Sequence, residues 1–386
     1  MSKVHTPDPT DVSWQQAREF AHSFVHVGET EFVSLASGDK KVCAENVIAL
    51  TNLPFADSSS MDGWAVNGDG PWTLTDAQQL GKNQASVLTT GSTLPTGSQA
   101  IVRTENGTLA GDQLTSVSAN TGDIRYAGEE CSIGQALSAP GVNLNPALIG
   151  LMAATGHDRV KVFKQPIVQI IVTGDELLTS GLPTPKRVRD SLGIQVPMWL
   201  NRMGAHVLPV LYRRDQADEI SKALVSSQAD MLLTTGGTAA SAKDHFITAI
   251  SNAGGEVLLD GVAVRPGHPM KLAVVRNYQG KQIPVVGLPG NPLAAMVALS
   301  TLVQPMLNKI LGQQLQPLIP MTAAKSLHGS KSGTRLAPGW VTETGFTAAE
   351  FSGSAMLRGL STSTGFAVMT HEVDRGGTVS FLPLPT

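Results

Sequence analysis

Residues 283–299, IPVVGLPGNPLAAMVAL, decide the fold of this chain because they predict a strand, a tight loop and a helix in succession. The β-branched run at the start indicates a buried strand, and residues 287–290 indicate a tight glycine loop. Asn291 suits a helix N-cap, and Pro292 suits the first helical position. Such a loop directs backbone N–H groups and the positive end of the helix dipole toward one point, which predicts an anion site. The same pattern also occurs in purely geometric turns.

The sequence around this stretch alternates between strands and helices. Strands are predicted at 166–173, 206–211 and 231–235, and helices near 190–203, at 216–227 and beyond Asp244. This alternation predicts an α/β fold with a doubly wound parallel sheet that binds its ligand at the carboxyl ends of the strands. Pro197 falls about two turns into the first of these helices, so we expect that helix to be bent or to start late.

The flanking regions have a different pattern. Residues 11–27 carry apolar side chains at helical spacing, and residues 31–66 are expected to be extended. Short alternating segments at 71–124 predict a small β module, and 148–156 predict a short helix. The chain becomes β-rich again after residue 313.

Composition excludes several classes of protein. The net charge is −3, with 28 basic and 31 acidic residues among 386 and no basic run, so nucleic acid is not expected as a partner. The two cysteines, Cys43 and Cys131, provide neither a disulfide framework nor a zinc cluster and fit a reducing compartment. No signal peptide or membrane span is predicted, so we expect a cytoplasmic protein without membrane contact.

Four acidic residues follow predicted strands or occupy glycine turns: Asp62, Glu176, Asp215 and Asp244. Three of them belong to the predicted parallel sheet, where strand ends meet at one edge. Clustered carboxylates beside phosphate-binding loops would hold Mg²⁺, which prefers hard oxygen ligands, and Glu176, Asp215 and Asp244 are the predicted metal ligands. Each could equally be a cap or turn residue.

Two further loops are candidates for binding an anion. Thr235, Gly236 and Gly237 follow a predicted strand, where glycine allows the backbone to approach a ligand closely. The rigid turn 264–269, VRPGHP, carries Arg265, which suits a bidentate grip on an oxyanion, and His268, which adds charge only when protonated.

Several of these motifs occur in the order seen in one known family. The chain resembles the molybdopterin molybdenumtransferases, including the bacterial enzymes and the E domain of gephyrin, over roughly residues 12–310. The resemblance rests on PFADSSSMDGWAV (54–66), TTGSTLPTGSQAIVRTE (89–105), IRYAGEE (124–130), VTGDEL (172–177), LTTGGTAASAKD (233–244), VRPGHP (264–269) and GLPGNPLAA (287–295).

The resemblance implies an elongated subunit of four domains. These are a dimer-forming linker domain (1–46 and 125–160), a β-rich lobe with the MDG motif (47–124), the molybdopterin-binding α/β domain (161–312) and a β-barrel-like C-terminal domain (313–386). It also implies a homodimer in which the β-rich lobe reaches over the partner's cleft, and a reaction in which molybdate enters adenylylated molybdopterin with Mg²⁺ assistance and release of AMP. A molybdopterin adenylyltransferase and other cofactor-synthesis proteins are implied as partners.

Site residues carry over by motif position. Asp62, Glu176, Asp215 and Asp244 match catalytic positions, and the matching substrate-binding positions are Thr90, Asp190, Thr235, Gly236, Gly237, Arg265, His268, Pro289, Gly290, Asn291 and Ser354.

This chain departs from the family pattern at Arg265, His268, Leu192, Ile247 and Pro338, and its loop 237–241 lacks a serine and a glycine of the family's GGxSxG motif. Each reduces or alters the positive charge or hydrogen bonding offered to an anion. An alternative is therefore a weakened or inactive relative that binds molybdopterin as a carrier or scaffold. A third hypothesis is an adenylyltransferase that acts one step earlier.

Overall fold

The computed structural model describes residues 12–236, 245–330 and 333–385. The chain divides into two compact units, one with residues 32–162 and one with the residues on either side of that segment. The four-domain division stays a prediction, although the units have separate hydrophobic cores.

The larger unit is built on a seven-stranded mixed sheet, which confirms the α/β class. The main strand order is β16-β13-β18-β22-β21-β19, and β17 also pairs with β13. The bounds are β13 (Ile167–Thr173), β16 (His206–Val207), β17 (Leu211–Arg213), β18 (Met231–Thr235), β19 (Glu256–Asp260), β21 (Lys271–Arg276) and β22 (Gln282–Leu288).

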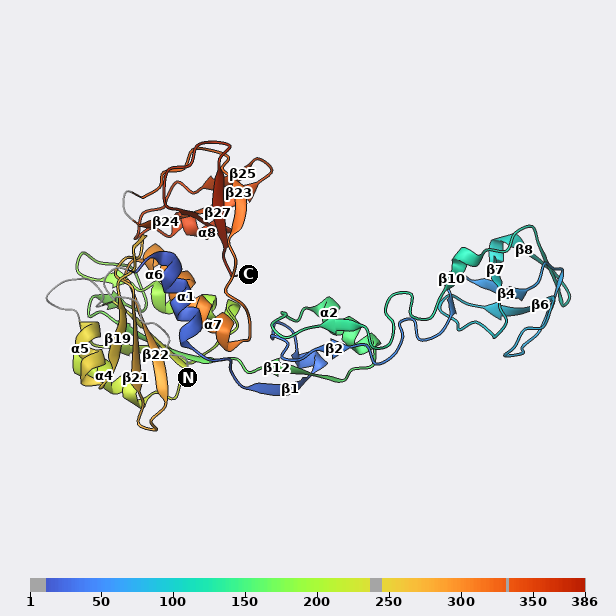
Figure 1. The fold of residues 1–386 in the computed structure, drawn as a ribbon, viewed down its shortest axis with the longest axis horizontal. Helices are drawn as coiled ribbons and strands as arrows, with labels where there is room; N and C mark the ends of the chain where they lie inside the picture. Colours follow the sequence, from blue (N-terminus) through green and yellow to red (C-terminus); the bar gives the residue numbers. More distant parts are fainter. Residues whose placement is uncertain (1–11, 237–244, 331–332, 386) are drawn as a thin grey trace. The chain divides into compact units, whose positions relative to one another are not determined.

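Helices cover both faces of this sheet, as the doubly wound prediction requires (Figure 1). On one face lie α4 (Ala217–Ser226) and α5 (His245–Asn252). On the other face lie α1 (Trp14–Phe24), α3 (Leu192–Arg202), α6 (Pro292–Ala298), the π-helical turn η4 (Leu299–Val303) and α7 (Gln304–Ile310).

The stretch Pro292–Ile310 is long and apolar enough to cross a membrane by length and composition alone, but 78% of its apolar window is buried inside the protein. The core of this unit therefore accounts for its composition. The Trp14 indole donates a hydrogen bond to Thr301 Oγ1 (2.9 Å), which ties α1 to this helical stretch.

Two details of the predicted sheet are wrong. The strand β21 runs antiparallel to both β22 and β19, because a tight turn at 277–281 connects it directly to β22. The single strand expected at 206–211 is two short strands, β16 and β17. Pro209 lies between them and has no N–H to donate to a sheet ladder.

The helix α3 starts at Leu192, two residues after the expected start near Asp190, and Pro197 still lies inside it. Proline removes the N–H that would bond the carbonyl four residues earlier, at Gly193. That glycine has a second role, because a Cβ there would overlap Asp190 Oδ2 and lie 2.5 Å from the Tyr212 hydroxyl oxygen.

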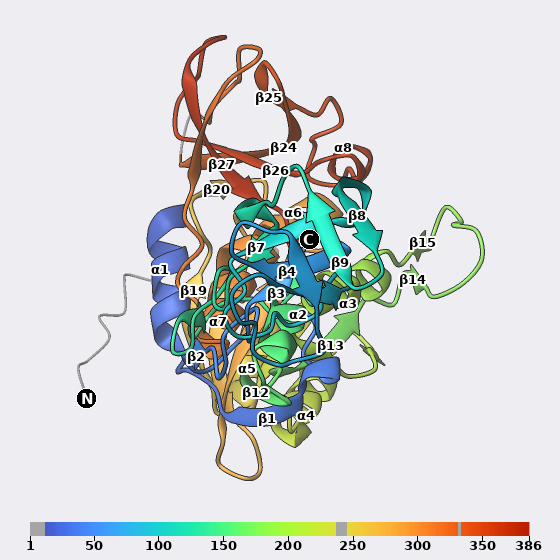
Figure 2. The same ribbon diagram turned by 90° about the vertical axis from the view of Figure 1, so that its right-hand side faces the viewer.

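A six-stranded sheet forms the C-terminal part of the same unit. Its main strand order is β20-β24-β26-β27-β23, and β25 pairs with β24. The bounds are β20 (Val264–Arg265), β23 (Ile319–Thr322), β24 (Thr334–Thr342), β25 (Gly345–Ala348), β26 (Gly365–Met369) and β27 (Thr378–Pro383), with the short helix α8 (Arg358–Ser361). Strand β20 comes from the chain between β19 and β21, so residues 261–270 leave one sheet, join the other and return (Figure 2).

The second unit is mainly β-structure. Its largest sheet has the order β7-β4-β6-β5-β9-β8 and confirms the small β module expected at 71–124. The bounds are β4 (Gly63–Asn67), β5 (Trp72–Leu74), β6 (Gln84–Leu88), β7 (Ala100–Arg103), β8 (Gly107–Ala110) and β9 (Gln113–Ser116). Two-stranded pairs and one helix form the remainder: β1 (Thr30–Ser34) with β12 (Arg159–Phe163), β2 (Val47–Ile48) with β11 (Ala136–Ser138), β3 (Ser58–Ser59) with β10 (Ile124–Arg125), and α2 (Pro146–Ala154).

We predict that Gly193→Ala destabilises the larger unit by about 1–3 kcal/mol, the usual cost of forcing extra atoms into a packed site. The matched control is Gly150→Ala in α2, where an added Cβ meets nothing within 4 Å. That change should be neutral or stabilise its helix by up to about 1 kcal/mol. Calorimetric unfolding of both variants measures the difference, and equal effects would contradict the proposed close approach.

Candidate active site

Three neighbouring parallel strands end at the same level and form the floor of the candidate site. Val172, Thr235 and Leu288 lie in one register row. Thr173 Oγ1 donates a hydrogen bond to the carbonyl oxygen of Thr235 (2.7 Å), and Gly236 N–H donates to that of Leu288 (3.3 Å). These bonds bring the 172–177 loop, Gly236 and the 287–291 loop to one edge of the sheet.

Gly236 is needed for this arrangement. Its φ of +86° favours glycine, and a Cβ there would lie 3.1 Å from the carbonyl oxygen of Thr173. The glycine therefore lets two strand ends approach each other. Gly237 and Asp244 lie outside the described residues.

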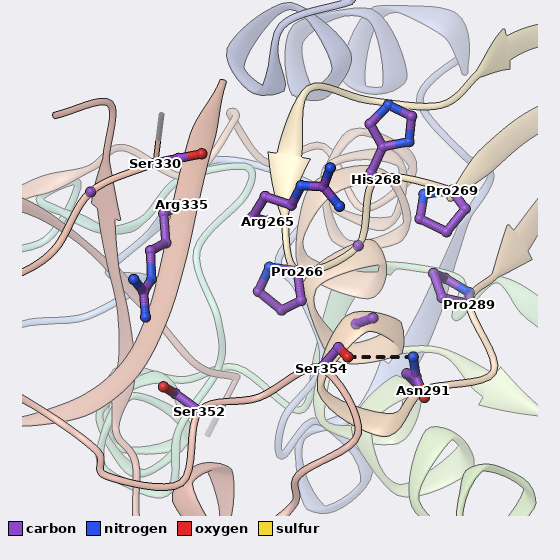
Figure 3. Close-up of a pocket in the computed structure, with 13 residues that line it drawn as sticks. Arg265, Pro266, His268, Pro269, Pro289, Asn291, Ser330, Arg335, Ser352 and Ser354 are labelled. Atoms are coloured by element: carbon purple, nitrogen blue, oxygen red, sulfur yellow. Dashed lines mark hydrogen bonds between the residues drawn. The ribbon is translucent and has the colours of Figure 1, made fainter. Parts of the chain in front are cut away.

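A pocket of about 530 Å³ lies beside the 287–291 loop, and we call it the cationic pocket (Figure 3). It brings together Arg265, His268, Pro289, Asn291 and Ser354, five residues predicted from sequence. Its lining contains two arginines and a histidine but no acidic residue among the described positions. Guanidinium groups without a facing carboxylate favour an oxyanion.

Arg335 is a charged residue of the pocket lining that sequence reasoning missed. It lies on β24 and pairs in register with Arg265 on β20, a strand of the same six-stranded sheet. The α/β part contributes Pro289 and Asn291 to the same pocket. Figure 3 shows Arg335 on β24, across the pocket from His268. Only the long-range pairing of residues 264–265 with 334–335 could have revealed it, and no local motif signals that pairing.

The expected anion site at the helix N-terminus is wrong in one respect. The N–H groups of Leu293 and Ala294 at the start of α6 already donate to the carbonyl oxygen of Ser354 (3.0 and 3.3 Å). Asn291 is the N-cap residue, but its side chain does not cap the helix and instead donates to Ser354 Oγ (3.4 Å). The charge that attracts an anion here therefore comes mainly from side chains.

The predicted acidic residues have different surroundings. Glu176 is exposed near the end of β13. Asp215 follows β17, and its Oδ1 atom is buried and has no hydrogen-bond partner among the residues that the structure describes. Among the described residues, no group of three histidine, cysteine or acidic side chains could hold a metal ion.

Asp190 has a structural role in this fold. It is 4% exposed, and its Oδ1 accepts the N–H groups of Leu192 and Gly193 (2.9 and 3.0 Å) at the start of α3. Its Oδ2 accepts the Tyr212 hydroxyl (2.8 Å). Burial, with this bond, raises the pKa of Tyr212 to about 12, so the hydroxyl remains a donor at neutral pH.

Asp62 and Thr90 contact each other within the second unit. Asp62 Oδ1 accepts the Thr90 N–H (2.6 Å) and the Thr90 hydroxyl (3.0 Å). These bonds, the backbone one first, hold the pKa of Asp62 below its usual range. Ionised Asp62 therefore favours the folded state above the ordinary carboxyl pKa, and this contribution is lost as the pH falls through the lowered value.

An ion pair between half-buried Arg103 and buried Asp123 supports the neighbouring Ser60. Arg103 Nε and Nη2 donate to the two carboxylate oxygens of Asp123 (2.8 Å each), and the arginine holds the pKa of Asp123 below its usual range. The carbonyl oxygen of Asp123 in turn accepts the N–H and the hydroxyl of Ser60. Hydrogen bonds at Ser60 and at Asp62 thus hold the MDG segment in place.

Comparison with known proteins places these features in context. A probable molybdopterin binding domain matches residues 169–309, and the MoeA N-terminal region (domain I and II) matches residues 12–156. The molybdopterin molybdenumtransferase of Haemophilus influenzae is 30% identical over 314 residues, covering 74% of each chain. That of Bacillus subtilis is 29% identical over 337 residues, covering 80% of this chain and 76% of its own.

Solved structures show the same fold. Two structures of the molybdopterin biosynthesis MoeA protein from Pyrococcus horikoshii superpose with TM-scores of 0.74 and 0.71. Their sequences are 22% and 17% identical to this one, and the alignments cover 97% and 96% of this chain and 99% of theirs.

We predict that Thr90→Val raises the pKa of Asp62 only part of the way to its ordinary value, because the stronger backbone bond remains. Thr89→Val is the matched control, since the Thr89 hydroxyl contacts Ser92 instead of Asp62. Carboxyl-carbon NMR titration measures both variants. An unchanged Asp62 pKa in Thr90→Val would show that the hydroxyl bond does not act on this carboxylate.

Proposed function

The chain belongs to the molybdopterin molybdenumtransferase family and is a transferase of molybdenum cofactor biosynthesis, and from this premise we propose that it inserts molybdate into adenylylated molybdopterin and releases AMP. The observation that carries the proposal is the cationic pocket, where Arg265 and Arg335 flank the glycine loop that follows β22. Molybdate is a tetrahedral dianion, and two guanidinium groups match its charge and its hydrogen-bond acceptors.

The remaining groups of the pocket orient the oxyanion. The Ser354 hydroxyl and the Asn291 amide contact each other and can both donate to molybdate oxygens. His268 adds a third positive charge when its imidazole is protonated. Arg265 and Arg335 offset the negative charge that accumulates when molybdate approaches the phosphate-bearing pterin.

Mg²⁺ belongs to the proposal, with Glu176, Asp215 and Asp244 as its ligands. The Asp215 Oδ1 atom is buried and has no hydrogen-bond partner in the described part of the chain. Such an oxygen is free to ligate a cation. When bound, the ion would supply positive charge at the pyrophosphate that is cleaved. The protein's own contribution is to hold Glu176 and Asp215 near the ends of β13 and β17.

We also propose that the enzyme acts as a homodimer in which Asp62 of one copy completes the cleft of the other. In support, the second unit exposes large apolar side chains, Phe32, Ile48, Leu50, Phe55 and Ile133, each at least 46% exposed. Light scattering tests this assembly. A cytoplasmic location is consistent with two buried free thiols, Cys43 and Cys131.

The function is tested by incubating purified protein with adenylylated molybdopterin, molybdate and Mg²⁺ and measuring AMP release and active cofactor. We expect both products. Pterin binding without AMP release, with molybdate or tungstate, would instead support the carrier hypothesis. ATP consumption with metal-free molybdopterin would identify an adenylyltransferase.

We predict that Arg335→Gln raises the KM for molybdate by about 10- to 150-fold, because the loss of a charge-assisted contact costs about 1.5–3 kcal/mol. Arg375→Gln, which removes a C-terminal arginine outside the cationic pocket, is the control and should leave KM unchanged. Steady-state kinetics with varied molybdate measures both. Equal KM values for Arg335→Gln and the wild type would remove Arg335 from the molybdate site.

A further inference from the structure

A second basic pocket lies on the other side of the strand ends. It has a volume of about 470 Å³ and is lined by Arg187, Arg213 and Arg214, together with the end of β13. We call it the arginine pocket. These three arginines lie outside the predicted site residues, and the mechanism proposed above does not use them.

The geometry leaves these arginines available to a ligand. Val172 pairs with Tyr212 and Thr173 pairs with Arg213, so the pocket sits at the carboxyl ends of β13 and β17. Arg187 Nη2 donates to the carbonyl oxygen of Leu177 (2.9 Å), and Arg213 Nη1 donates to that of Tyr212 (2.9 Å). These bonds fix the side chains without neutralising them, because a backbone carbonyl carries no charge.

The charge balance favours an anion with more than one negative charge. Within the described part of the chain, none of the three arginines forms an ion pair with a carboxylate, and Asp175 is the one acidic residue in the lining. The hydroxyls of Thr179 and Ser180 add neutral donors. Planar guanidinium groups bind phosphate oxygens in pairs, so a phosphate group suits this set better than a carboxylate.

The position of the pocket connects it to the reaction. Strands β13 and β22 are separated only by β18, so their ends lie roughly 10 Å apart at normal strand spacing. The arginine pocket adjoins the end of β13, and the cationic pocket adjoins the end of β22. The two basic pockets therefore flank Gly236 on the same edge of the sheet.

We propose that Arg187, Arg213 and Arg214 bind the phosphate of the nucleotide half of the substrate while the cationic pocket binds molybdate. The inference rests on the proposed function in naming the substrate, but the phosphate site itself can be measured without turnover. Tyr212 also lines the pocket and is 42% exposed, so its ring offers an aromatic face near the phosphate. A nucleotide should consequently bind more tightly than inorganic phosphate.

The test is calorimetric titration of the full-length protein with AMP, inorganic phosphate and adenosine in a phosphate-free buffer of low ionic strength. We expect AMP to bind more tightly than inorganic phosphate, and adenosine to bind at least 10-fold more weakly than AMP. The double variant Arg213→Gln/Arg214→Gln should lose at least 10-fold in AMP affinity. Arg187→Lys, which keeps the charge but loses the paired hydrogen bonds, should lose affinity to a smaller extent.

Arg276→Gln is the matched control. Arg276 is also exposed and also donates through Nη1 to a backbone carbonyl, that of Gly280 (3.2 Å), but it lies at the opposite edge of the same sheet. Its AMP affinity should equal that of the wild type. Thermal unfolding of every variant separates loss of the site from loss of the fold.

Three results would overturn the inference: AMP affinity that is unchanged in the double variant, adenosine that binds as well as AMP, or AMP affinity that falls in Arg335→Gln but not in the double variant. The last result would place the phosphate in the cationic pocket. A protein that binds AMP through these arginines but forms no cofactor would refute the proposed function and leave the phosphate site standing. Cofactor formation together with normal AMP affinity in the double variant would refute the phosphate site and leave the proposed function standing.

Discussion

The level at which β13, β18 and β22 end is the constraint on which the rest of the site depends. Parallel pairing puts Val172, Thr235 and Leu288 in one row, and the bond from Thr173 Oγ1 to Thr235 locks the first two strand ends together. Gly236 then turns with a positive φ that a side chain would oppose. Because the loops all begin from this fixed edge, small polar and charged residues on them face a common region.

Charge at this edge is supplied by side chains rather than by a helix dipole alone. The carbonyl oxygen of Ser354 accepts two N–H groups of α6, so the loop between β25 and α8 is bonded to the helix that follows the glycine loop. The arginines come from segments far apart in the sequence, Arg265 and Arg335 on one side and Arg187 and Arg213 on the other. The fold collects them, and no local basic run is needed.

Sequence patterns predicted the parts of the fold that depend on local spacing. Residues 283–299 were enough for β22, its loop and α6, and the apolar periodicity around Leu192 and Leu200 located α3 despite Pro197. The antiparallel direction of β21 was not predictable from its composition, since buried strands read alike in either direction. Its short connection to β22 was the available signal.

The same limit applies to the site. Arg265 and Asn291 lie in short motifs and were found, whereas Arg335 needs the pairing of β20 with β24, 70 residues apart in sequence, to reach the cationic pocket. The family resemblance predicts Asp190 as a substrate-binding residue, and the structure shows that its carboxylate also accepts hydrogen bonds from the start of α3 and from Tyr212. A sequence motif identifies such a carboxylate without showing which hydrogen bonds it makes.

The excursion of residues 261–270 between two sheets has a mechanical consequence. Both ends of this segment are anchored, at Asp260 and Lys271 in the α/β sheet, while its middle is a strand of the C-terminal sheet. Insertions or deletions there would pull one sheet against the other, so the fold restricts the length of this segment. The fixed backbone path also keeps Arg265 and His268 in the lining of the cationic pocket.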